Sequence, residues 1–363
     1  MTFGHRLLNW FDKHQRPLPW RKKYLPYEVW VSEIMLQQTQ VETALPYFER
    51  WMKAFPTIES LAKSDEKKVL KLWQGLGYYS RARNLLETAQ RVVKDFGGQF
   101  PSNYETIHSL KGIGPYSAGA IASIAFNQER PIVDGNVLRV LTRVYAIDTP
   151  IDDLKNRDQF WQLQESLIPK GQARFFNQAL MELGALICSS SNPQCDRCPI
   201  QKFCKAYQEK TVDLYPVRKK RKKTVKVEAS AVILEDDGRY LIQKRPLGKI
   251  MGGLWEFPEW KLARDKKLSL KEIKNKTLKN LQCQSGIKRF DLKYRAVIKR
   301  NYTHHLESLH VFDAHPDKRG HVKYLTCPRL SDKKWLCVWA TKKEFQKYPF
   351  SSAHAKIAEL IQG

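Results

Sequence analysis

The chain has 363 residues, a length typical of two domains rather than one. Hydrophobic residues make up 42% of it and aromatic residues 11%, which is enough for packed cores and excludes a wholly disordered chain. Lysine and arginine number 63 against 37 acidic residues, so the formal charge is +26. This charge predicts a polyanionic partner such as nucleic acid; a basic surface that serves only solubility is the alternative.

The sequence does not predict a membrane-spanning or secreted protein. No stretch approaches the roughly 20 apolar residues of a membrane span, and the N-terminal segment MTFGHRLLNWFDKHQ lacks the apolar run of a signal peptide. Because the tails are short and no transit peptide is visible, we expect a cytoplasmic bacterial protein that is associated with the nucleoid.

The first part of the chain has the spacing of amphipathic helices. Segments 27–40, 45–55 and 65–76 carry apolar residues three and four positions apart, and proline and glycine separate them. Segment 117–126, SAGAIASIAF, is rich in small residues and predicts a closely packed helix. We therefore predict an all-α domain over residues 1–210.

The pattern changes after this domain. Residues 218–226 hold seven basic side chains in nine positions, which predicts a solvated linker over 211–227, either a plain tether or a DNA contact. Beyond it, strand-like runs alternate with two helical stretches, one near 268–282 and one at the C-terminus. The strands are expected at 227–235 and 239–245, which flank an Asp-Asp-Gly hairpin turn, and at 293–299, 308–314 and 335–340. These elements predict an α+β domain over 228–363.

Four of the seven cysteines lie close together in the pattern C-x6-C-x2-C-x5-C, namely Cys188, Cys195, Cys198 and Cys204. Thiolates at this spacing can converge on one centre. Zinc is the main competing ligand, but zinc sites usually pair two short knuckles and the loop 188–204 has only one. A set of sulfur ligands alone favours a soft iron–sulfur centre. The other three cysteines are scattered, and we expect them to be small buried apolar residues.

A glycine-rich turn precedes the helix of small residues. Gly112 and Gly114 bracket one isoleucine, and Pro115 occupies a position that suits the first turn of a helix. The backbone N–H groups of such a turn can approach a phosphate, which the helix N-terminus also favours. An ordinary tight turn between two helices is the alternative.

Two carboxylates stand in contrasting settings. Glu33 shares a helix face with Val29, Trp30 and Leu36, so its pKa should be raised and it could hold a proton near neutral pH. Asp134 precedes a helix as an N-cap residue would, so helix N–H groups should keep it ionised. Taken singly, either residue could be structural. Together they resemble the acid and the anion that hydrolysis of an N-glycosidic bond requires.

Several blocks resemble the MutY family of helix-hairpin-helix DNA glycosylases in the same order, and with the cysteine loop they span residues 5 to 205. The blocks are WVSEIMLQQTQVETALPYF (30–48), GLGYYSRARNL (75–85), LKGIGPYSAGAI (110–121), VDGNVLRVL (133–141) and MELGALIC (181–188). The resemblance implies a [4Fe–4S] cluster on the four cysteines. It also implies that Gly112 and Gly114 contact DNA.

The resemblance assigns roles to individual residues. It implies Glu33 as the acid at adenine N7 and Asp134 as the carboxylate beside the sugar, assisted by Asn136 and Tyr116. Bifunctional relatives place a lysine at the position of Tyr116 and form a Schiff base, so we expect a monofunctional enzyme that uses water. The implied pocket for the extruded adenine consists of Arg16, Trp20, Arg21 and Glu182, and the residues implied to enter the duplex are Gln38 and Tyr78.

The second half resembles the Nudix-like C-terminal domain of the same family at MGGLWEFP (251–258). Stretch 270–286 lacks the glutamate-rich REx2EExG pattern of a working Nudix hydrolase, so we expect no pyrophosphatase activity. The best match to the family's Phe-Ser-His loop for 8-oxoguanine is Tyr302-Thr303-His304; His305 competes with His304, and a plain polar cluster at a strand end is the alternative.

The resemblance therefore implies a monomeric adenine DNA glycosylase that acts on duplex DNA with 8-oxoguanine:adenine or guanine:adenine mispairs. One rival is an endonuclease III-like glycosylase and lyase, which Tyr116 disfavours. The other is a non-catalytic DNA-binding or redox-sensing protein, which the presence of both Glu33 and Asp134 disfavours.

Overall fold

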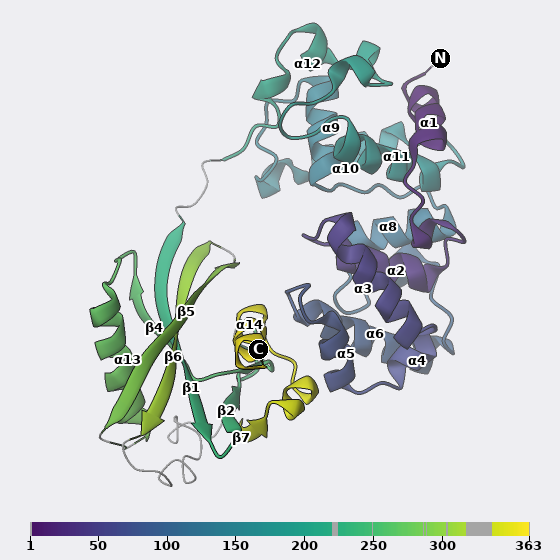
Figure 1. Cartoon of the computed structure of the whole chain (residues 1–363). Helices are drawn as coiled ribbons and strands as arrows, with labels where there is room; N and C mark the ends of the chain where they lie inside the picture. Colours follow the sequence, from purple (N-terminus) through teal and green to yellow (C-terminus); the bar gives the residue numbers. More distant parts are fainter. Residues whose placement is uncertain are drawn as a thin grey trace. The chain divides into compact units, whose positions relative to one another are not determined.

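The computed structural model describes residues 2–219, 224–248, 250–285, 287, 289–302, 304–316 and 336–362 (Figure 1). The chain divides into two compact units, residues 1–64 with 80–221 and residues 65–79 with 222–363. None of the helices in the described ranges is long and apolar enough to cross a membrane. Helix α5 (Glu66–Trp73) thus falls in the second unit, where the hydroxyl of Tyr79 donates to the carbonyl oxygen of Phe350 at 3.1 Å.

The first unit is helical, as the sequence predicts. Its longer helices are α1 (Phe3–His14), α2 (Pro26–Leu36), α3 (Val41–Ala54), α6 (Ser80–Phe96), α8 (Pro115–Phe126), α9 (Gly135–Tyr145), α10 (Arg157–Leu167) and α11 (Ala173–Leu186). Its short helices are α4 (Ile58–Ala62), α7 (Tyr104–His108) and α12 (Lys205–Gln208), and its 3-10 turns are η1 (Pro19–Arg21), η2 (Leu154–Asn156), η3 (Cys195–Arg197), η4 (Gln201–Phe203) and η5 (Val212–Leu214).

Helix α8 is a central helix of this unit, and its sequence explains why. Residues 117–125 are all buried, and most are alanine, glycine or serine, so neighbouring backbones can approach closely. A Cβ atom on Gly119 would lie 2.3 Å from the carbonyl oxygen of Pro131. Helices α2 and α11 both pack against α8, which brings the first and the last parts of this unit together.

The second unit contains a mixed seven-stranded sheet in its described part. Its strands are β1 (Val225–Asp236), β2 (Arg239–Lys244), β3 (Trp255–Glu256), β4 (Glu259–Arg264), β5 (Phe290–Tyr302), β6 (His305–Pro316) and β7 (Leu336–Thr341). The main order is β3-β2-β1-β6-β5, with β4 paired to β1 and β7 paired to β2. The β1–β6 pair is parallel, and the other pairs are antiparallel. The turn η7 (Lys343–Lys347) and the helices α13 (Leu270–Ser285) and α14 (Ser352–Gln362) complete the unit.

Strand β1 is buried on both of its faces. Ala231 and Ile233 pack with α14, whereas Val232 and Leu234 belong to the core that α13 covers, so the two helices lie on opposite faces of the sheet (Figure 1). The predicted hairpin at 236–238 and the two predicted helical stretches are confirmed. Our expectation of three buried cysteines is wrong for Cys283, which is exposed. The buried face of α13 carries Ile273, Thr277 and Leu281, and Cys283 does not lie on it. Cys337 is partly exposed, and Cys327 lies outside the described residues.

Candidate active site and cysteine centre

Glu33 lies in the middle of α2, on a helix whose residues 29–35 are all buried. Pro26 occupies the first turn of this helix, where its missing N–H costs nothing. The Glu33 side chain is 5% exposed, and its Oε2 accepts a hydrogen bond from the hydroxyl of Tyr116 at 3.0 Å. Tyr116 stands in the first turn of α8, so the packing of α2 on α8 creates this pair.

Burial raises the pKa of Glu33 to about 7. The hydrogen bond from Tyr116 and the charge of Arg21 oppose the shift, whereas the nearby carboxylate of Asp134 adds to it. The expected direction of this pKa therefore agrees with the geometry. A carboxyl group in this setting can hold a proton at neutral pH and deliver it to a base that is leaving.

Asp134 is the N-cap residue of α9, where the sequence places it. Its Oδ1 accepts from the backbone N–H of Val137 at 2.7 Å, and its Oδ2 accepts from the side-chain amide of Asn136 at 2.9 Å. Burial nevertheless raises the pKa of Asp134, while these two donors and the charge of Arg139 lower it. Desolvation therefore acts on both carboxyls, and the ionised state of Asp134 stays a prediction. What distinguishes Asp134 from Glu33 is the number of donors that stabilise its anion.

Glu182 of α11 is buried and receives hydrogen bonds from two arginines. Arg16 donates from its backbone N–H at 3.0 Å and from its side-chain Nε at 2.9 Å, and Arg21 donates from Nη2 at 3.0 Å. Although burial raises the pKa of Glu182, the hydrogen bonds from Arg16 and Arg21 outweigh it and lower this pKa to about 2. Glu182 is thus a permanent anion that orients two guanidinium groups.

One pocket of about 740 Å³ collects these side chains. Of the residues that we predicted from the sequence, it is lined by Glu33, Tyr116, Asp134, Asn136, Arg16, Trp20, Arg21, Glu182 and Gln38. Trp20 is 5% exposed and packs edge-on against Phe48, at a ring distance of 4.9 Å. The pocket is large enough for a purine base, and its wall offers both a proton donor and an anion.

Among the lining residues that the sequence analysis did not assign to the site, three contact its candidate residues directly. Gln178 accepts from Arg21 Nε at 2.9 Å, and Met181 lies 3.4 Å from the hydroxyl of Tyr116. Arg139 donates from Nη2 to Asn136 Oδ1 at 2.8 Å. A helical spacing could have revealed two of them, since Gln178 precedes Glu182 by four residues and Arg139 follows Asn136 by three.

Helix α11 also approaches the catalytic candidates through its backbone. A Cβ atom on Gly184 would lie 2.7 Å from the Cβ of Asn136, so the two helices are nearly in backbone contact there. Arg139 spans the same junction, because its Nη2 donates to the carbonyl oxygen of Gly184 and its Nε to that of Cys188, both at 2.7 Å. The pocket and the cysteine loop are thereby joined by one side chain.

Of the predicted DNA contacts, Gln38 is the one that lines this pocket. Gly112 has a φ of +77°, and a Cβ there would lie 2.5 Å from Asn84 Nδ2, so only glycine fits. Gly114 is the N-cap residue of α8, with Pro115 directly after it, as the sequence predicts. Gln38 and Tyr78 both have positive φ angles, +58° and +45°, and the Tyr78 side chain is 51% exposed.

One cavity of the first unit is lined by all four clustered cysteines, namely Cys188, Cys195, Cys198 and Cys204. The buried guanidinium of Arg143 donates to Cys188 Sγ at 3.3 Å and to the carbonyl oxygen of Ser189 at 2.7 Å. Burial is the largest cause that raises the pKa of Cys198 to about 12, and the three neighbouring thiols contribute to the same shift. Four thiolates can therefore coexist here only around a positive centre, so the donor set fits a metal or an iron–sulfur cluster.

Two of the three predicted lesion-reading residues, Tyr302 and His304, lie where β5 ends and β6 begins. Tyr302 is the last residue of β5 and pairs with His305, the first residue of β6. The two rings stack, with centroids 5.2 Å apart and planes 17° apart. His304 is exposed, and Thr303 lies outside the described residues.

Comparison with known proteins places the chain in a family. Residues 31–165 match the HhH-GPD superfamily of base excision DNA repair proteins, and residues 229–360 match the NUDIX domain family. The human adenine DNA glycosylase is 33% identical over the whole chain and 74% of its own length. The chain belongs to the adenine DNA glycosylase family. It is accordingly a DNA glycosylase, an enzyme of base excision repair.

Other relatives agree with this membership. The adenine DNA glycosylase of Buchnera aphidicola subsp. Schizaphis graminum is 40% identical over 71% of this chain and 75% of its own. The match to the Arabidopsis thaliana adenine DNA glycosylase is 41% identical over 69% of this chain, but it spans only 46% of the plant protein. Among solved structures, a thermostable thymine-DNA glycosylase is 30% identical over 57% of this chain and 95% of its own, with a TM-score of 0.52. This chain thus combines a helical glycosylase unit with a Nudix-like unit.

Proposed function

We propose that the chain hydrolyses the N-glycosidic bond of adenine paired with 8-oxoguanine, and of adenine paired with guanine, in duplex DNA. The observation that carries this proposal is the convergence of Glu33, Tyr116, Asp134 and Asn136 in one pocket, beside the anion Glu182 and its two arginines. The product is an abasic site in an uncut strand. The enzyme acts as a monomer in the bacterial cytoplasm.

The reaction divides between the two carboxyls. Glu33 gives its proton to N7 of adenine, and the bond between C1′ and N9 breaks, with its electron pair leaving on the base. The carboxylate of Asp134 stabilises the positive charge that develops on the sugar. Water then adds its oxygen to C1′, oriented by Asn136, and loses a proton to a carboxylate of the pocket.

Tyr116 supports a hydrolytic route over an amine route. Its hydroxyl donates to Glu33 and lies near Met181, and it offers no nitrogen that could attack the sugar. A Schiff base with the opened sugar would need a lysine at this place. We therefore propose a monofunctional glycosylase without lyase activity.

The four cysteines hold a [4Fe–4S] cluster in this proposal, with zinc as the alternative. A bound cluster would supply positive charge and fix the loop 188–204, and it takes no part in cleavage of the glycosidic bond. Arg139 and Arg143, both in α9, then hold the start of the loop through the carbonyl oxygen and the sulfur of Cys188. Analysis of the purified protein for iron and acid-labile sulfide distinguishes the two metals.

The C-terminal unit reads 8-oxoguanine in this proposal. Helix α13 stands where a Nudix hydrolase carries its metal-binding glutamates, yet its one glutamate, Glu272, caps the helix by accepting from the backbone N–H of Ser269 at 2.8 Å. A nucleotide pyrophosphatase activity therefore has no ligand set in this helix. Tyr302, Thr303 and His304 at the β5–β6 turn are the candidates for the lesion contact.

A single-turnover assay tests the proposal. The substrate is a duplex with one central 8-oxoguanine:adenine pair, and alkali reveals abasic sites after the reaction. Strand cleavage at the adenine only after alkali supports both the substrate and the monofunctional route. Cleavage without alkali, with an adduct trapped by borohydride, would instead support a lyase. No base release from protein that holds its iron would support a binding protein without catalysis.

A further inference from the structure

A buried polar network lies behind the turn between β5 and β6. The hydroxyl of Tyr302 donates to Glu307 Oε2 at 2.5 Å. Glu307 is fully buried and lies opposite Arg300 in the β5–β6 register. The hydrogen bond therefore connects Tyr302, at the end of β5, to the cross-strand pair of Arg300 and Glu307. Arg300 Nε donates to Glu307 Oε1 at 2.6 Å.

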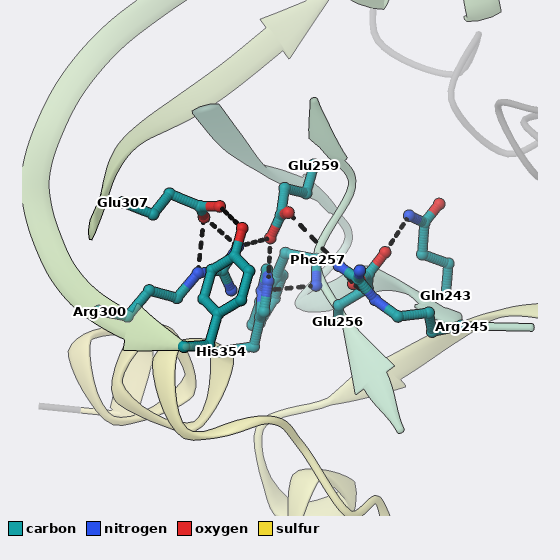
Figure 2. A network of polar contacts seen from close by, with 9 residues as sticks. Gln243, Arg245, Glu256, Phe257, Glu259, Arg300, Glu307 and His354 are labelled. Atoms are coloured by element: carbon teal, nitrogen blue, oxygen red, sulfur yellow. Dashed lines mark hydrogen bonds and ion pairs between the residues drawn. The ribbon is translucent and has the colours of Figure 1, made fainter. Parts of the chain in front are cut away.

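The network continues from the hairpin to the C-terminal helix (Figure 2). Arg300 Nη2 donates to Glu259 Oε2 at 2.8 Å, and the same oxygen lies 2.8 Å from Nε2 of His354 in α14. The backbone N–H of Phe257 donates to His354 Nδ1 at 3.1 Å, so Nδ1 is an acceptor and Nε2–H is the donor to Glu259. The contacts therefore run without a break from Tyr302 at the turn to His354 in the core.

The same cluster could be mistaken for a metal site. One ligand atom each from Glu256, Glu259 and His354 lie within 4.8 Å of one another, and all three residues are buried. Arg245 bridges the two glutamates, however, donating to Glu256 at 2.6 Å and to Glu259 at 3.3 Å. Because guanidinium groups and a histidine N–H already face these oxygens, the cluster is an internal ion-pair network and not a cation site.

We propose that Glu307, held by Arg300, is a positioning residue that fixes the ring of Tyr302 for contact with 8-oxoguanine. This inference rests on the proposed lesion-reading role of the turn. A tyrosine at the end of a strand is held by its two side-chain torsions alone unless its hydroxyl is anchored. Here the charged acceptor anchors the hydroxyl, and the stacked ring of His305 supports one side of the aromatic group.

The network explains why a buried carboxylate is retained so close to an exposed turn. Glu307 would cost free energy alone, yet it accepts from both Arg300 and Tyr302, and Arg300 is in turn shared with Glu259. The side chain of Arg300 is only 11% exposed, so the pair is little screened by solvent. The orientation of the Tyr302 ring is thus set from inside the domain and not by the turn.

Tyr302→Phe and Glu307→Gln in the full chain test this inference, with Tyr294→Phe as the matched control. The first variant removes only the anchored hydroxyl, the second removes the charge of its acceptor, and the control removes a hydroxyl from the same strand. The equilibrium affinity of each protein is measured for two duplexes that carry an uncleavable adenine analogue, opposite 8-oxoguanine or opposite guanine. The saturated excision rate and the unfolding temperature are measured beside it.

We expect both variants to lose about tenfold in affinity for the 8-oxoguanine duplex. Affinity for the guanine duplex should fall much less than affinity for the 8-oxoguanine duplex. Tyr294→Phe should match the wild type on both duplexes. Equal affinity losses on the two duplexes, or an unchanged preference in Tyr302→Phe, would overturn the inference. If Glu307→Gln fails to fold, Tyr302→Phe still decides. A wild-type protein with no preference for 8-oxoguanine would instead refute the lesion-reading role itself.

Discussion

The hydroxyl of Tyr116 donates to Glu33 Oε2 at 3.0 Å across the α2–α8 contact. Neither side chain reaches far into solvent, so the pair is held in a medium where a carboxylate is costly. The bond joins the proposed general acid, Glu33, to Tyr116, which stands where a lyase would carry a lysine. The first three predictions follow from the protonation of Glu33 in this pair.

Glu33→Gln should abolish excision and leave binding intact. The amide keeps the shape of the side chain and can still accept from Tyr116, but it has no proton to give, so we expect the single-turnover rate to fall by roughly 10²- to 10⁴-fold. Affinity for the uncleavable 8-oxoguanine duplex should stay near that of the wild type. Full activity in the variant would remove Glu33 from the acid role.

The pH dependence of excision should show the raised pKa of Glu33. Burial lifts this pKa to about 7, and the protonated form is the active one. The single-turnover rate at saturating DNA should therefore fall as the pH rises through about 7. It should also fall in acid, once Asp134 takes up a proton. A rate that is flat between pH 6 and pH 8 would contradict the assignment.

The same pKa predicts a stability effect. A carboxyl whose folded pKa lies above its unfolded value of 4.5 lowers the stability of the fold as the pH rises from about 4.5 to about 7, and the cost persists above that. At pH 8 the Glu33→Gln variant should therefore be more stable than the wild type, because it lacks the ionisable group. Its free energy of unfolding should be higher by up to about 3 kcal/mol, and its unfolding temperature should be higher as well. At pH 5 the two proteins should unfold at nearly the same temperature. Thermal unfolding at the two pH values measures the difference.

Arg139→Lys should slow excision without removing iron. Lysine cannot reach Asn136, Gly184 and Cys188 together, so the amide beside Asp134 loses its fixed orientation. A misplacement of this kind costs on the order of 10²-fold in rate at most. Arg50→Lys serves as the control. Arg50 is exposed, and its guanidinium lies over the ring of Tyr47 and makes none of these contacts. Equal rates for the two variants would show that Arg139 does not position Asn136.

Cys198→Ser should release the bound iron and destabilise the helical unit. Its thiol is largely buried among the other three, and the loop 188–204 has little regular structure of its own. We expect lower iron and sulfide content and a lower unfolding temperature, both read on the purified protein. Cys283→Ser, at an exposed site on α13, is the matched control and should retain its iron. A variant with full iron content would show that Cys198 is not a ligand.

The local sequence predicts much of the helical unit and its candidate acid. Pro26 and Pro115 mark two helix starts, and Asp134 precedes a helix as a cap should, because these preferences act within one turn of the chain. The desolvation of Asp134 was not visible in the same way. It depends on α11 packing against α9, which is a tertiary contact between residues about 50 positions apart.

The network behind the β5–β6 turn shows the same limit. Glu259, Arg300, Glu307 and His354 are spread over nearly 100 residues, and in the sequence each looks like a solvent-facing charge on a strand or helix. The pairing of β1 with both β4 and β6 and the packing of α14 on the sheet bring them together. The placement of α5 with the second unit is likewise a consequence of contacts that no local pattern encodes.

The close approach at Gly184 limits how this pocket can change through mutation. A Cβ atom on residue 184 would collide with Asn136, so a substitution there would disturb the packing of α9 on α11 and the proposed water-orienting amide together. Even Gly184→Ala, which adds a single carbon atom, would force α9 and α11 apart beside Asn136, the residue proposed to orient water. Residue 184 therefore sets the spacing of α9 and α11 at the wall of the pocket, and the short distance leaves no room for a side chain.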